Sequence, residues 1–290
     1  MKIEIDKVEY DLSKPNRRQF LKSSIGLLLA SMHHPLVLPE TKNRNHMSLN
    51  GHNHPLIISL RLKTATPLAQ LKRFYCEVLE LPLLTEQSDE ITVRAGETPV
   101  TFVPAGPESG EPFYHLAFNI PENKILLARK WQKERTPLFQ TPDNLCDPDY
   151  PDDVRHFRHW NAHSIFFFDP AGNVLEYIAR HDLNNASTGP FTSADILYAS
   201  EIGFTSDKVE ATALELRRAF SLMQYRQGND NFRAIGDEFG LLLVFIRGRE
   251  LGRGSDKVRE ADVFPTTISI RAEKHGSYST PDYPYLISAD

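Results

Sequence analysis

The sequence has little cysteine, no excess of positive charge and no long hydrophobic run, and each shortage excludes a class of protein. Its two cysteines, Cys76 and Cys146, lie far apart and outside any Cys-x-x-Cys pair, so they resemble neither a zinc ligand set nor a disulfide framework. We expect Cys76 to be a core thiol on an apolar helix, with a Cys76–Cys146 disulfide as the alternative. The 33 basic residues are scattered among 38 acidic ones and the net charge is -5, so no nucleic-acid partner is expected.

The first 53 residues differ from the rest of the chain and resemble an export signal. The pair Arg17-Arg18 precedes a short apolar stretch, residues 23–30, as in twin-arginine (Tat) signals. That stretch is far too short to cross a bilayer, so no membrane span is expected. The sequence therefore predicts a periplasmic or exported protein in which residues 1–53 are a Tat-like signal and a disordered tail. No small-x-small cleavage site follows and Met47 could start a shorter form, so a cytoplasmic protein is the alternative.

The rest of the chain has ordinary globular composition, with 40% hydrophobic and 24% charged residues, and shows internal self-similarity. A strand-like alternating run followed by a helix-like run occurs three times, starting at 56–62, 114–120 and 201–204. After each helix the pattern returns to strands that turn residues separate. In the second copy, residues 164–168 meet residues 173–178 across a turn that contains proline and glycine. This order predicts repeated βαβββ units.

The repeat also predicts how the units assemble. One unit is too small to bury its sheet face alone, so we expect an α+β fold in which paired βαβββ modules form a curved mixed-sheet cup with helices outside. Units that follow one another in the chain would share a cup. Residues 54–182 would then make a complete two-module domain, residues 183–193 a linker, and residues 194–290 a third module with a partial fourth.

Three runs of residues closely resemble the vicinal oxygen chelate superfamily, which includes glyoxalases, bleomycin-resistance proteins and extradiol dioxygenases. They are Phe74-Tyr75 with Val78-Leu79, the strand Phe113–Ile120, and the hairpin His163–Glu176. The resemblance implies paired βαβββ modules around a divalent metal, with ligands on the first and last strands of the modules. It is specific to the superfamily and not to one reaction within it.

The resemblance implies two metal ligands, His115 on the first strand of the second module and Glu176 on its last strand. Strand alternation places His115 on the face opposite Leu116 and Phe118, which point toward the helix layer. Glu176 lies in an apolar run, where a cation would offset the cost of burying its carboxylate. The ion would be iron, manganese or zinc. The alternatives are a hydrogen-bonded core histidine for His115 and a salt bridge for Glu176.

A third ligand is missing from its expected position. The family usually supplies it from the first strand of the first module, where this chain has Ile57, and two ligands are fewer than a catalytic zinc or iron site needs. His54 and His163 are candidates to supply it, with a hydrogen-bonded loop residue as the alternative for His163. Glu201 holds the ligand position of the third module, but Thr267 holds that of the fourth, so we expect no second metal site there.

A histidine-rich segment, residues 154–163, leads into the last hairpin of the second module. It contains His156, His159 and His163, and we expect it to overhang the mouth of the cup. Because histidine exchanges protons near neutral pH, His159 and His163 are the candidate catalytic residues. The alternative is a solvated loop rich in histidine and arginine.

Two functions fit these observations. The first is a glyoxalase-like or dioxygenase-like, metal-dependent enzyme that acts on a small, oxygen-rich substrate, in which the ion stabilises charge on vicinal oxygens. The second is a non-catalytic protein that binds a small molecule or drug, with a degenerate metal site and aromatic residues such as Trp160 that stack on the ligand. Both functions imply a small-molecule partner, and both are compatible with a homodimer.

Overall fold

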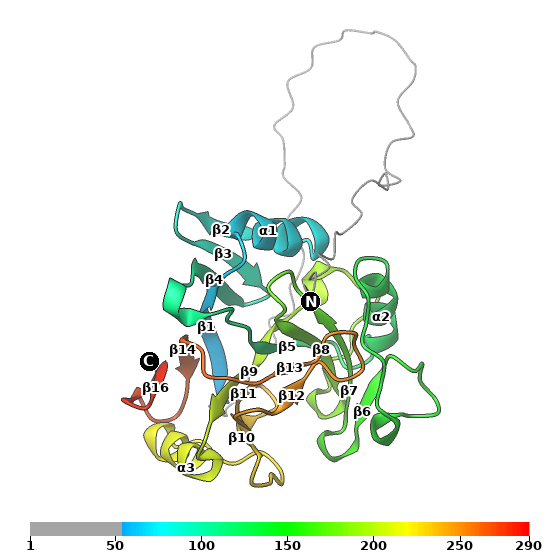
Figure 1. Ribbon diagram of the computed structural model, residues 1–290. Helices are drawn as coiled ribbons and strands as arrows, with labels where there is room; N and C mark the ends of the chain where they lie inside the picture. Colours follow the sequence, from blue (N-terminus) through cyan, green and yellow to red (C-terminus); the bar gives the residue numbers. More distant parts are fainter. Residues whose placement is uncertain (1–53, 290) are drawn as a thin grey trace, which may run out of the picture. The chain divides into compact units, whose positions relative to one another are not determined.

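The computed structural model describes residues 54–289, which all belong to one compact unit. Two seven-stranded sheets and a two-stranded ribbon make up most of it (Figure 1). The predicted export signal and tail, residues 1–53, lie outside the described residues. Within the described part, no helix is both long enough and apolar enough to cross a membrane.

Strands outnumber helices throughout the described residues. The strands are β1 (Leu56–Thr64), β2 (Leu83–Glu86), β3 (Ile91–Ala95), β4 (Thr98–Pro104), β5 (His115–Ile120), β6 (Arg155–Phe157), β7 (Ala162–Phe168), β8 (Val174–Arg180), β9 (Tyr198–Ser206), β10 (Phe232–Asp237), β11 (Gly240–Ile246), β12 (Glu250–Leu251), β13 (Arg259–Glu260), β14 (Thr266–Arg271), β15 (Gly276–Thr280) and β16 (Tyr283–Ala289). The α-helices are α1 (Leu68–Lys72), which continues as a π-helical turn (Arg73–Val78), α2 (Ile125–Lys133) and α3 (Val209–Phe220). Short 3-10 helices cover Pro107–Ser109, Asp143–Leu145, Arg158–Trp160, His181–Leu183 and Ser193–Asp195.

The order of elements confirms the predicted modules. The first module is β1, α1 and β2 to β4, and the second is β5, α2 and β6 to β8. The third module begins with β9, α3, β10 and β11, whereas β14 to β16 form a partial fourth module without a helix. The α+β architecture of paired modules is therefore the one that the sequence predicted.

The pairing of the modules differs from the prediction. Strand β5 of the second module pairs antiparallel with β9 of the third, in a sheet ordered β10-β11-β9-β5-β8-β7-β6. The first module pairs with the partial fourth through β1 and β14, in a sheet ordered β15-β16-β14-β1-β4-β3-β2. Residues 54–182 are thus not one complete cup, and residues 183–193 join two modules of the same sheet. Each module offers the same first-strand edge to any other, so adjacency in the chain does not decide the partner.

Alternation along β5 divides its side chains between two environments, as predicted. Leu116, Phe118 and Ile120 are buried in the main hydrophobic core, which draws residues from both sheets. Burying each such side chain contributes roughly 1.5–3 kcal/mol. A slip of one residue would exchange this face for the one that carries His115, so the core fixes the register of β5.

The turn between β7 and β8 is held by a buried carboxylate. Asp169 accepts hydrogen bonds from the Tyr75 hydroxyl at 2.8 Å, from the Asn173 side chain at 2.7 Å and from the backbone amides of Ala171 and Asn173 at 2.9 Å. The Asn173 side chain in turn accepts a hydrogen bond from the backbone amide of Tyr114, at the start of β5. This network sets the start of β8 against the start of β5, the two strands that carry His115 and Glu176.

Candidate metal centre

Three neighbouring strands bring His115, Glu176 and Glu201 together on one face of their sheet. Ala117 of β5 lies opposite Glu176 of β8 on one side and opposite Glu201 of β9 on the other. His115 lies two residues before Ala117 and therefore shares its face. One ligand atom from each of the three side chains lies within 4.8 Å of the other two.

The distances in this cluster suit a shared ion. Nε2 of His115 lies 3.4 Å from Oε2 of Glu176 and 3.6 Å from Oε2 of Glu201. Ligand atoms at about 2.1 Å from a tetrahedral ion are about 3.4 Å apart. His115 and Glu176 therefore meet the geometric condition for two ligands of one metal.

Burial and charge make this cluster electrostatically unusual. The side chains of His115, Glu176 and Glu201 are 8%, 4% and 2% exposed. Burial lowers the pKa of His115, but hydrogen bonding and attraction from the two carboxylates outweigh burial and raise the pKa to about 9. Burial and the charge of Glu201 raise the pKa of Glu176. The two carboxylates thus compete for one positive charge, which a proton on His115 or a metal ion can supply.

The tautomer of His115 favours ligation through Nε2. Its Nδ1 atom lies 3.2 Å from the carbonyl oxygen of Val174, which can only accept a hydrogen bond. Nδ1 therefore carries the proton, and Nε2 is left to face Glu176 and Glu201. A metal-binding histidine commonly has such a backbone partner for its other nitrogen, because the partner orients the ring.

Glu201 is a candidate third ligand that the sequence alone did not bring to His115. The sequence places Glu201 at the ligand position of the third module, but it predicts that this module lies outside the cup that contains His115. The expected donor position, Ile57, lies in the main hydrophobic core on β1, a strand of the other sheet. His54 also lies elsewhere, since its Nδ1 atom is 2.6 Å from Asp237 and its ring stacks on Phe239. A signal for Glu201 was present in the sequence, but the pairing of β5 with β9 was not.

The fourth ligand position of the paired modules is apolar. Because His115 lies opposite Gly203 and Ala117 opposite Glu201, the antiparallel pair relates His115 to Glu201 by an approximate two-fold. The same two-fold relates Glu176 to Leu243 of β11, because Glu176 pairs with Ala117 and Leu243 pairs with Gly203. The cluster therefore has three candidate protein donors and an apolar fourth position.

Two arginines lie around the carboxylates. Arg180 is fully buried and donates to Oε1 of Glu201 and, at 3.1 Å, to the Asn119 side chain. Arg155 lies with its guanidinium carbon 4.2 Å from the ring centre of Phe166. Burial lowers the pKa of Arg155 to about 10, and the charge of Glu176 opposes this change.

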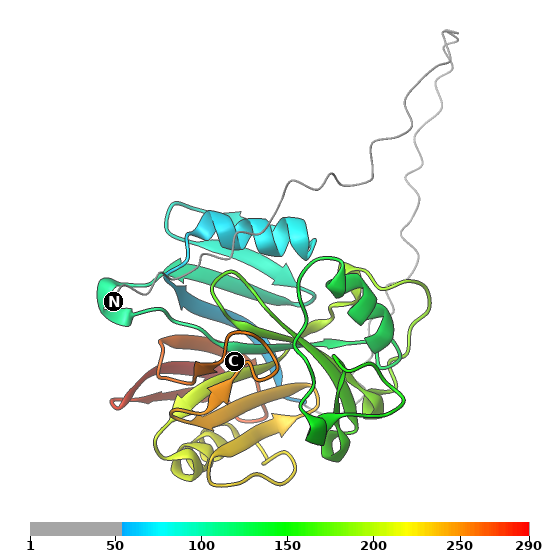
Figure 2. The ribbon, with the colours of Figure 1, turned by 45° about the vertical axis from the view of Figure 1, so that its right-hand side comes forward.

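Residues 247–263, here called the covering segment, lie over this face of the sheet (orange in Figures 1 and 2). Leu251 packs beside Phe166, and Ala261 packs beside Phe245. The Arg155 side chain donates to the carbonyl of Arg253 within the segment. The covering segment therefore shields the cluster from bulk water.

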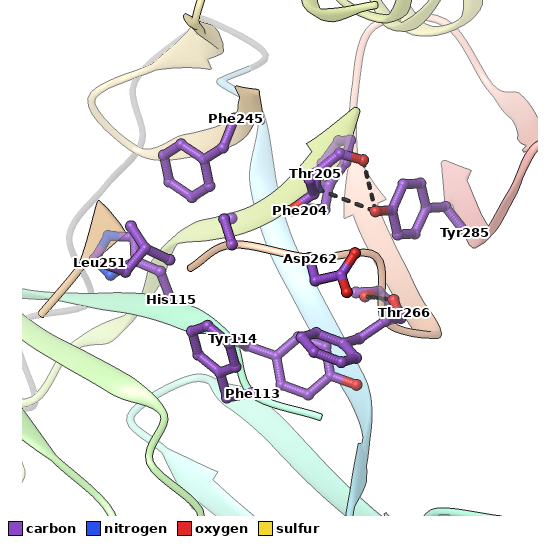
Figure 3. A pocket seen from close by; sticks show the side chains of 13 residues that line it. Phe113, Tyr114, His115, Phe204, Thr205, Phe245, Leu251, Asp262, Thr266 and Tyr285 are labelled. Carbon is purple, nitrogen blue, oxygen red and sulfur yellow. Dashed lines mark hydrogen bonds between the residues drawn. The ribbon is translucent and has the colours of Figure 1, made fainter. Parts of the chain in front are cut away.

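A small pocket of about 10 Å³ lies beside His115, between the covering segment and the sheet. His115 is one of its lining residues, and aromatic rings form much of its wall (Figure 3). Its other lining residues are Phe113, Tyr114, Gly203, Phe204, Thr205, Phe245, Leu251, Ala261, Asp262, Phe264, Thr266 and Tyr285.

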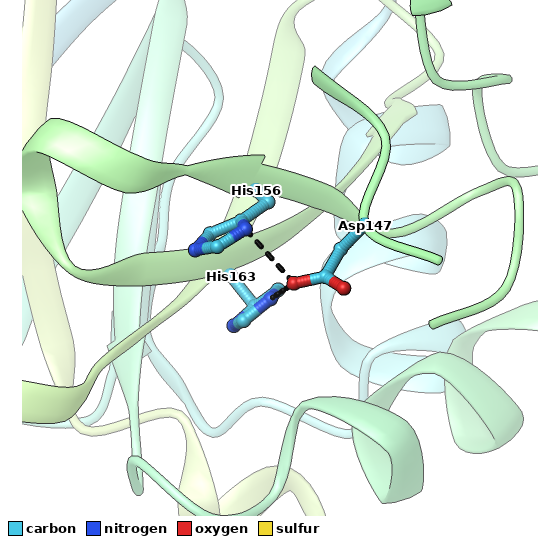
Figure 4. Close-up of side chains that lie close together, drawn as sticks. All are labelled: Asp147, His156 and His163. Carbon is cyan, nitrogen blue, oxygen red and sulfur yellow. Dashed lines mark hydrogen bonds and ion pairs between the residues drawn. The ribbon is translucent and has the colours of Figure 1, made fainter. Parts of the chain in front are cut away.

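The two predicted catalytic histidines lie apart from this cluster. Phe166 lies opposite Glu176 and shares its face, so His163, three residues earlier on β7, points to the opposite face. There His163 meets His156 and Asp147 (Figure 4). His159 is exposed on the 3-10 helix Arg158–Trp160. The predicted segment does not bring His163 to the metal centre, because Ile165, which shares its face, belongs to the core.

The two cysteines are not bonded to each other. Cys76 is partly buried against the main core and Cys146 is exposed, and both thiols are free. The disulfide alternative is therefore wrong for this structure.

No family model matches the chain, and no curated protein matches its sequence. Among solved structures, a candidate dioxygenase from Bacillus subtilis subsp. subtilis str. 168 is 15% identical over 83% of this chain and 86% of its own, with a TM-score of 0.51. Glyoxalase I from Zea mays is 13% identical over 81% of this chain and 92% of its own, with a TM-score of 0.45. A glyoxalase/bleomycin resistance protein/dioxygenase from Alicyclobacillus acidocaldarius is 19% identical over 43% and 92%, with a TM-score of 0.33. With its paired βαβββ modules, the chain has the vicinal oxygen chelate fold that its sequence resembles.

Proposed function

We propose that this chain is a metal-dependent enzyme that acts on a small substrate with vicinal oxygen atoms, as a glyoxalase or dioxygenase would. One observation carries the proposal: His115, Glu176 and Glu201 converge at 3.4 and 3.6 Å on one buried face. One imidazole and two carboxylates suit divalent iron, manganese or zinc. Three protein ligands leave coordination positions open for a substrate.

The surroundings of the cluster suit chemistry on an oxygen-rich molecule. A divalent ion held there would act as a Lewis acid toward two adjacent substrate oxygens and stabilise negative charge on them. The Phe166 and Phe245 rings each lie 6.2 Å from the His115 ring and form apolar walls. Arg155 stands over Phe166 as a fixed positive charge. The covering segment excludes water, which strengthens the attraction between these charges and a bound anion.

Metal content tests the proposal. Protein purified from cells grown with added iron, manganese or zinc is expected to hold one equivalent of metal in this cluster. Glu201→Gln keeps the shape of the side chain but removes its charge. We expect it to lower metal affinity at least about tenfold, since even an outer partner of a ligand is worth that much. His115→Gln and Glu176→Gln should do the same.

A matched control separates the cluster from general charge effects. Glu215→Gln changes an exposed glutamate on α3 and should leave metal affinity as in the wild type. Absence of metal under every growth condition, or equal affinity in the Glu201 and Glu215 variants, would refute the metal centre. Oxygen uptake with catechols and isomerisation of a thiol adduct of a 2-oxoaldehyde then distinguish the dioxygenase from the glyoxalase reaction.

A second candidate is a non-catalytic protein that binds a small molecule or drug. One observation favours it: the buried Arg180 already provides Glu201 with a positive partner, as in a degenerate metal site. Aromatic rings around the pocket would then hold the ligand by stacking. Stoichiometric binding of an aromatic ligand to metal-free protein, without turnover after metal is added, would select this function.

We also propose export through the Tat-like signal. Arg17-Arg18 and the apolar stretch at 23–30 support it. Fractionation of cells that express the full chain should place it outside the cytoplasm, and a double Arg17→Lys, Arg18→Lys variant should remain inside. An equal cytoplasmic location of both proteins would favour the cytoplasmic alternative.

A further inference from the structure

A second group of metal-binding side chains lies at the edge of the same sheet. His156 of β6 and His163 of β7 are direct cross-strand partners, and Asp147 comes from the loop between α2 and β6. Oδ2 of Asp147 lies 2.8 Å from Nδ1 of His156 and 3.2 Å from Nε2 of His163. Figure 4 shows both imidazoles directed at this one oxygen. We call these three residues the edge cluster.

The edge cluster is separate from the first metal centre. His163 has the parity of Ile165 and so points to the face of β7 opposite the one that Phe166 shares with Glu176. The two groups share no residue. An ion in the edge cluster would therefore share no ligand with the first centre.

One nitrogen of the edge cluster, Nδ1 of His156, makes no hydrogen bond within the described part of the chain. This atom is shielded from water, and its approach to Oδ2 of Asp147 at 2.8 Å lacks the alignment of a hydrogen bond. A buried polar atom left in this way is costly. A cation between this nitrogen and the carboxylate would give the His156 lone pair a partner and neutralise the charge of Asp147.

We propose that Asp147, His156 and His163 bind a second divalent transition-metal ion, with zinc as the best match to two imidazole nitrogens and one carboxylate oxygen. The separations of 2.8 and 3.2 Å approach the roughly 3.4 Å between ligand atoms around tetrahedral zinc. A water molecule would complete the four ligands. The side chains of Asp147 and His156 are 13% and 18% exposed, so an ion can enter from solvent.

Neighbouring residues hold His163 in place for this role. Its other nitrogen, Nδ1, lies 2.8 Å from Nε2 of His181. The Tyr150 ring stacks on the His163 ring with 3.9 Å between ring centres. Such partners orient a ligating histidine and select the nitrogen that faces the metal.

The position of the edge cluster indicates a structural role. It joins Asp147, in the long irregular connection from 134 to 154, to the edge strand β6 and its neighbour β7. The same connection meets the covering segment, where the Gln140 amide donates to the carbonyl of Gly254 at 2.7 Å. An ion at the edge cluster would therefore fasten the loop that helps to hold the covering segment over the first centre.

Cobalt binding tests the proposal, because tetrahedral Co²⁺ absorbs visible light and substitutes for zinc. Metal-free full-length protein carrying Glu201→Gln, which weakens the first centre, is titrated with Co²⁺. We expect one equivalent with a tetrahedral spectrum. Adding His156→Asn or Asp147→Asn should abolish the spectrum or weaken binding at least about tenfold. His159→Asn, an exposed histidine of the same segment, should leave it unchanged.

A second measurement keeps the test independent of folding. Zinc should slow proteolysis within residues 141–154 in the wild type and in the His159 variant, but not in the His156 variant, with circular dichroism showing equal folding of all three. Equal cobalt binding with and without His156, or no binding in the Glu201→Gln protein, would overturn the proposal. Two equivalents in the wild type and one in the Glu201→Gln protein would support both centres, whereas a single equivalent in both proteins that His156→Asn removes would support the edge cluster and refute the first centre.

Discussion

Glu201 presents its two carboxylate oxygens to two different cations. Oε2 lies 3.6 Å from Nε2 of His115, whereas Oε1 accepts a hydrogen bond from the fully buried Arg180. The same carboxylate thus serves as a candidate metal ligand and as half of a buried ion pair. How strongly an ion binds here depends on what else neutralises Glu201.

Replacement of Arg180 by methionine should separate these two roles. Removing one partner of a buried ion pair costs about 3–5 kcal/mol, because the remaining charge is uncompensated. We expect a loss of this size in metal-free protein and a smaller loss in metal-loaded protein, since the ion takes over the neutralisation of Glu201. Urea unfolding with and without metal measures both. Arg226→Met, at an exposed arginine that pairs with Asp182, should cost no more than about 1 kcal/mol. Equal losses in the two metal states would argue against an ion at Glu201.

Gly254 should be essential for docking the covering segment. Its φ is +87°, and a Cβ atom there would overlap the backbone carbonyl of Gln140. Gly248 has a φ of +77°, but nothing lies within 4 Å of the position of its Cβ atom. Both alanine variants therefore bear backbone strain of about 1–2 kcal/mol, whereas only Gly254→Ala displaces the segment. Hydrogen exchange across 247–263 should accelerate in Gly254→Ala alone, and similar exchange in the two variants would contradict this role.

The stabilisation that Asp153 contributes should be lost in acid. It is buried and its pKa is lowered: burial alone would raise it, but the ion pairs with Arg129 and with Lys133, at 3.0 Å, more than offset that effect. The stabilisation is therefore complete above about pH 5 and declines as the pH falls through about 4 and below. Asp153→Asn should cost about 1.5–3 kcal/mol near neutral pH, the range for hydrogen bonds to charged groups.

Urea unfolding across this pH range measures the effect of Asp153. The difference between the wild type and Asp153→Asn should shrink as the solution becomes more acidic. Asp256→Asn, at an exposed position, should follow the wild type at every pH. If this difference stays constant with pH, the charge of the Asp153 carboxylate does not stabilise the fold.

Asp169 should be required for the spacing of β5 and β8. Asp169→Asn keeps the size of the side chain but turns one acceptor oxygen into a donor, which would face the Tyr75 hydroxyl or the Asn173 amide. A buried polar group without a partner costs about 1–3 kcal/mol. We expect a loss of this size in unfolding free energy together with weaker metal binding at His115 and Glu176. Tyr75→Phe, which removes a single donor, should cost about 1 kcal/mol and leave metal affinity nearly unchanged.

Local patterns in the sequence were sufficient for much of the fold. Alternation on the strand 115–120 correctly separated the core-facing Leu116 and Phe118 from His115, because side chains of a strand point to opposite faces in turn. The turn after β7 was recognised from its proline and glycine. Alternation did not tell which face of β7 is the core, so His163 was expected near the metal centre and lies on the opposite face.

The sequence by itself determined the modules, their strand order and the placement of His115 and Glu176 on strands of one module. These depend on spacing of two to four residues, which local sterics and burial dictate. Only the tertiary structure decided that β9 pairs with β5, which brings Glu201 to 3.6 Å from His115, and that Asp147 meets His156 and His163 at the sheet edge. Such meetings follow from which strand edges pair and how a long loop returns, and similar modules compete for those pairings on nearly equal terms.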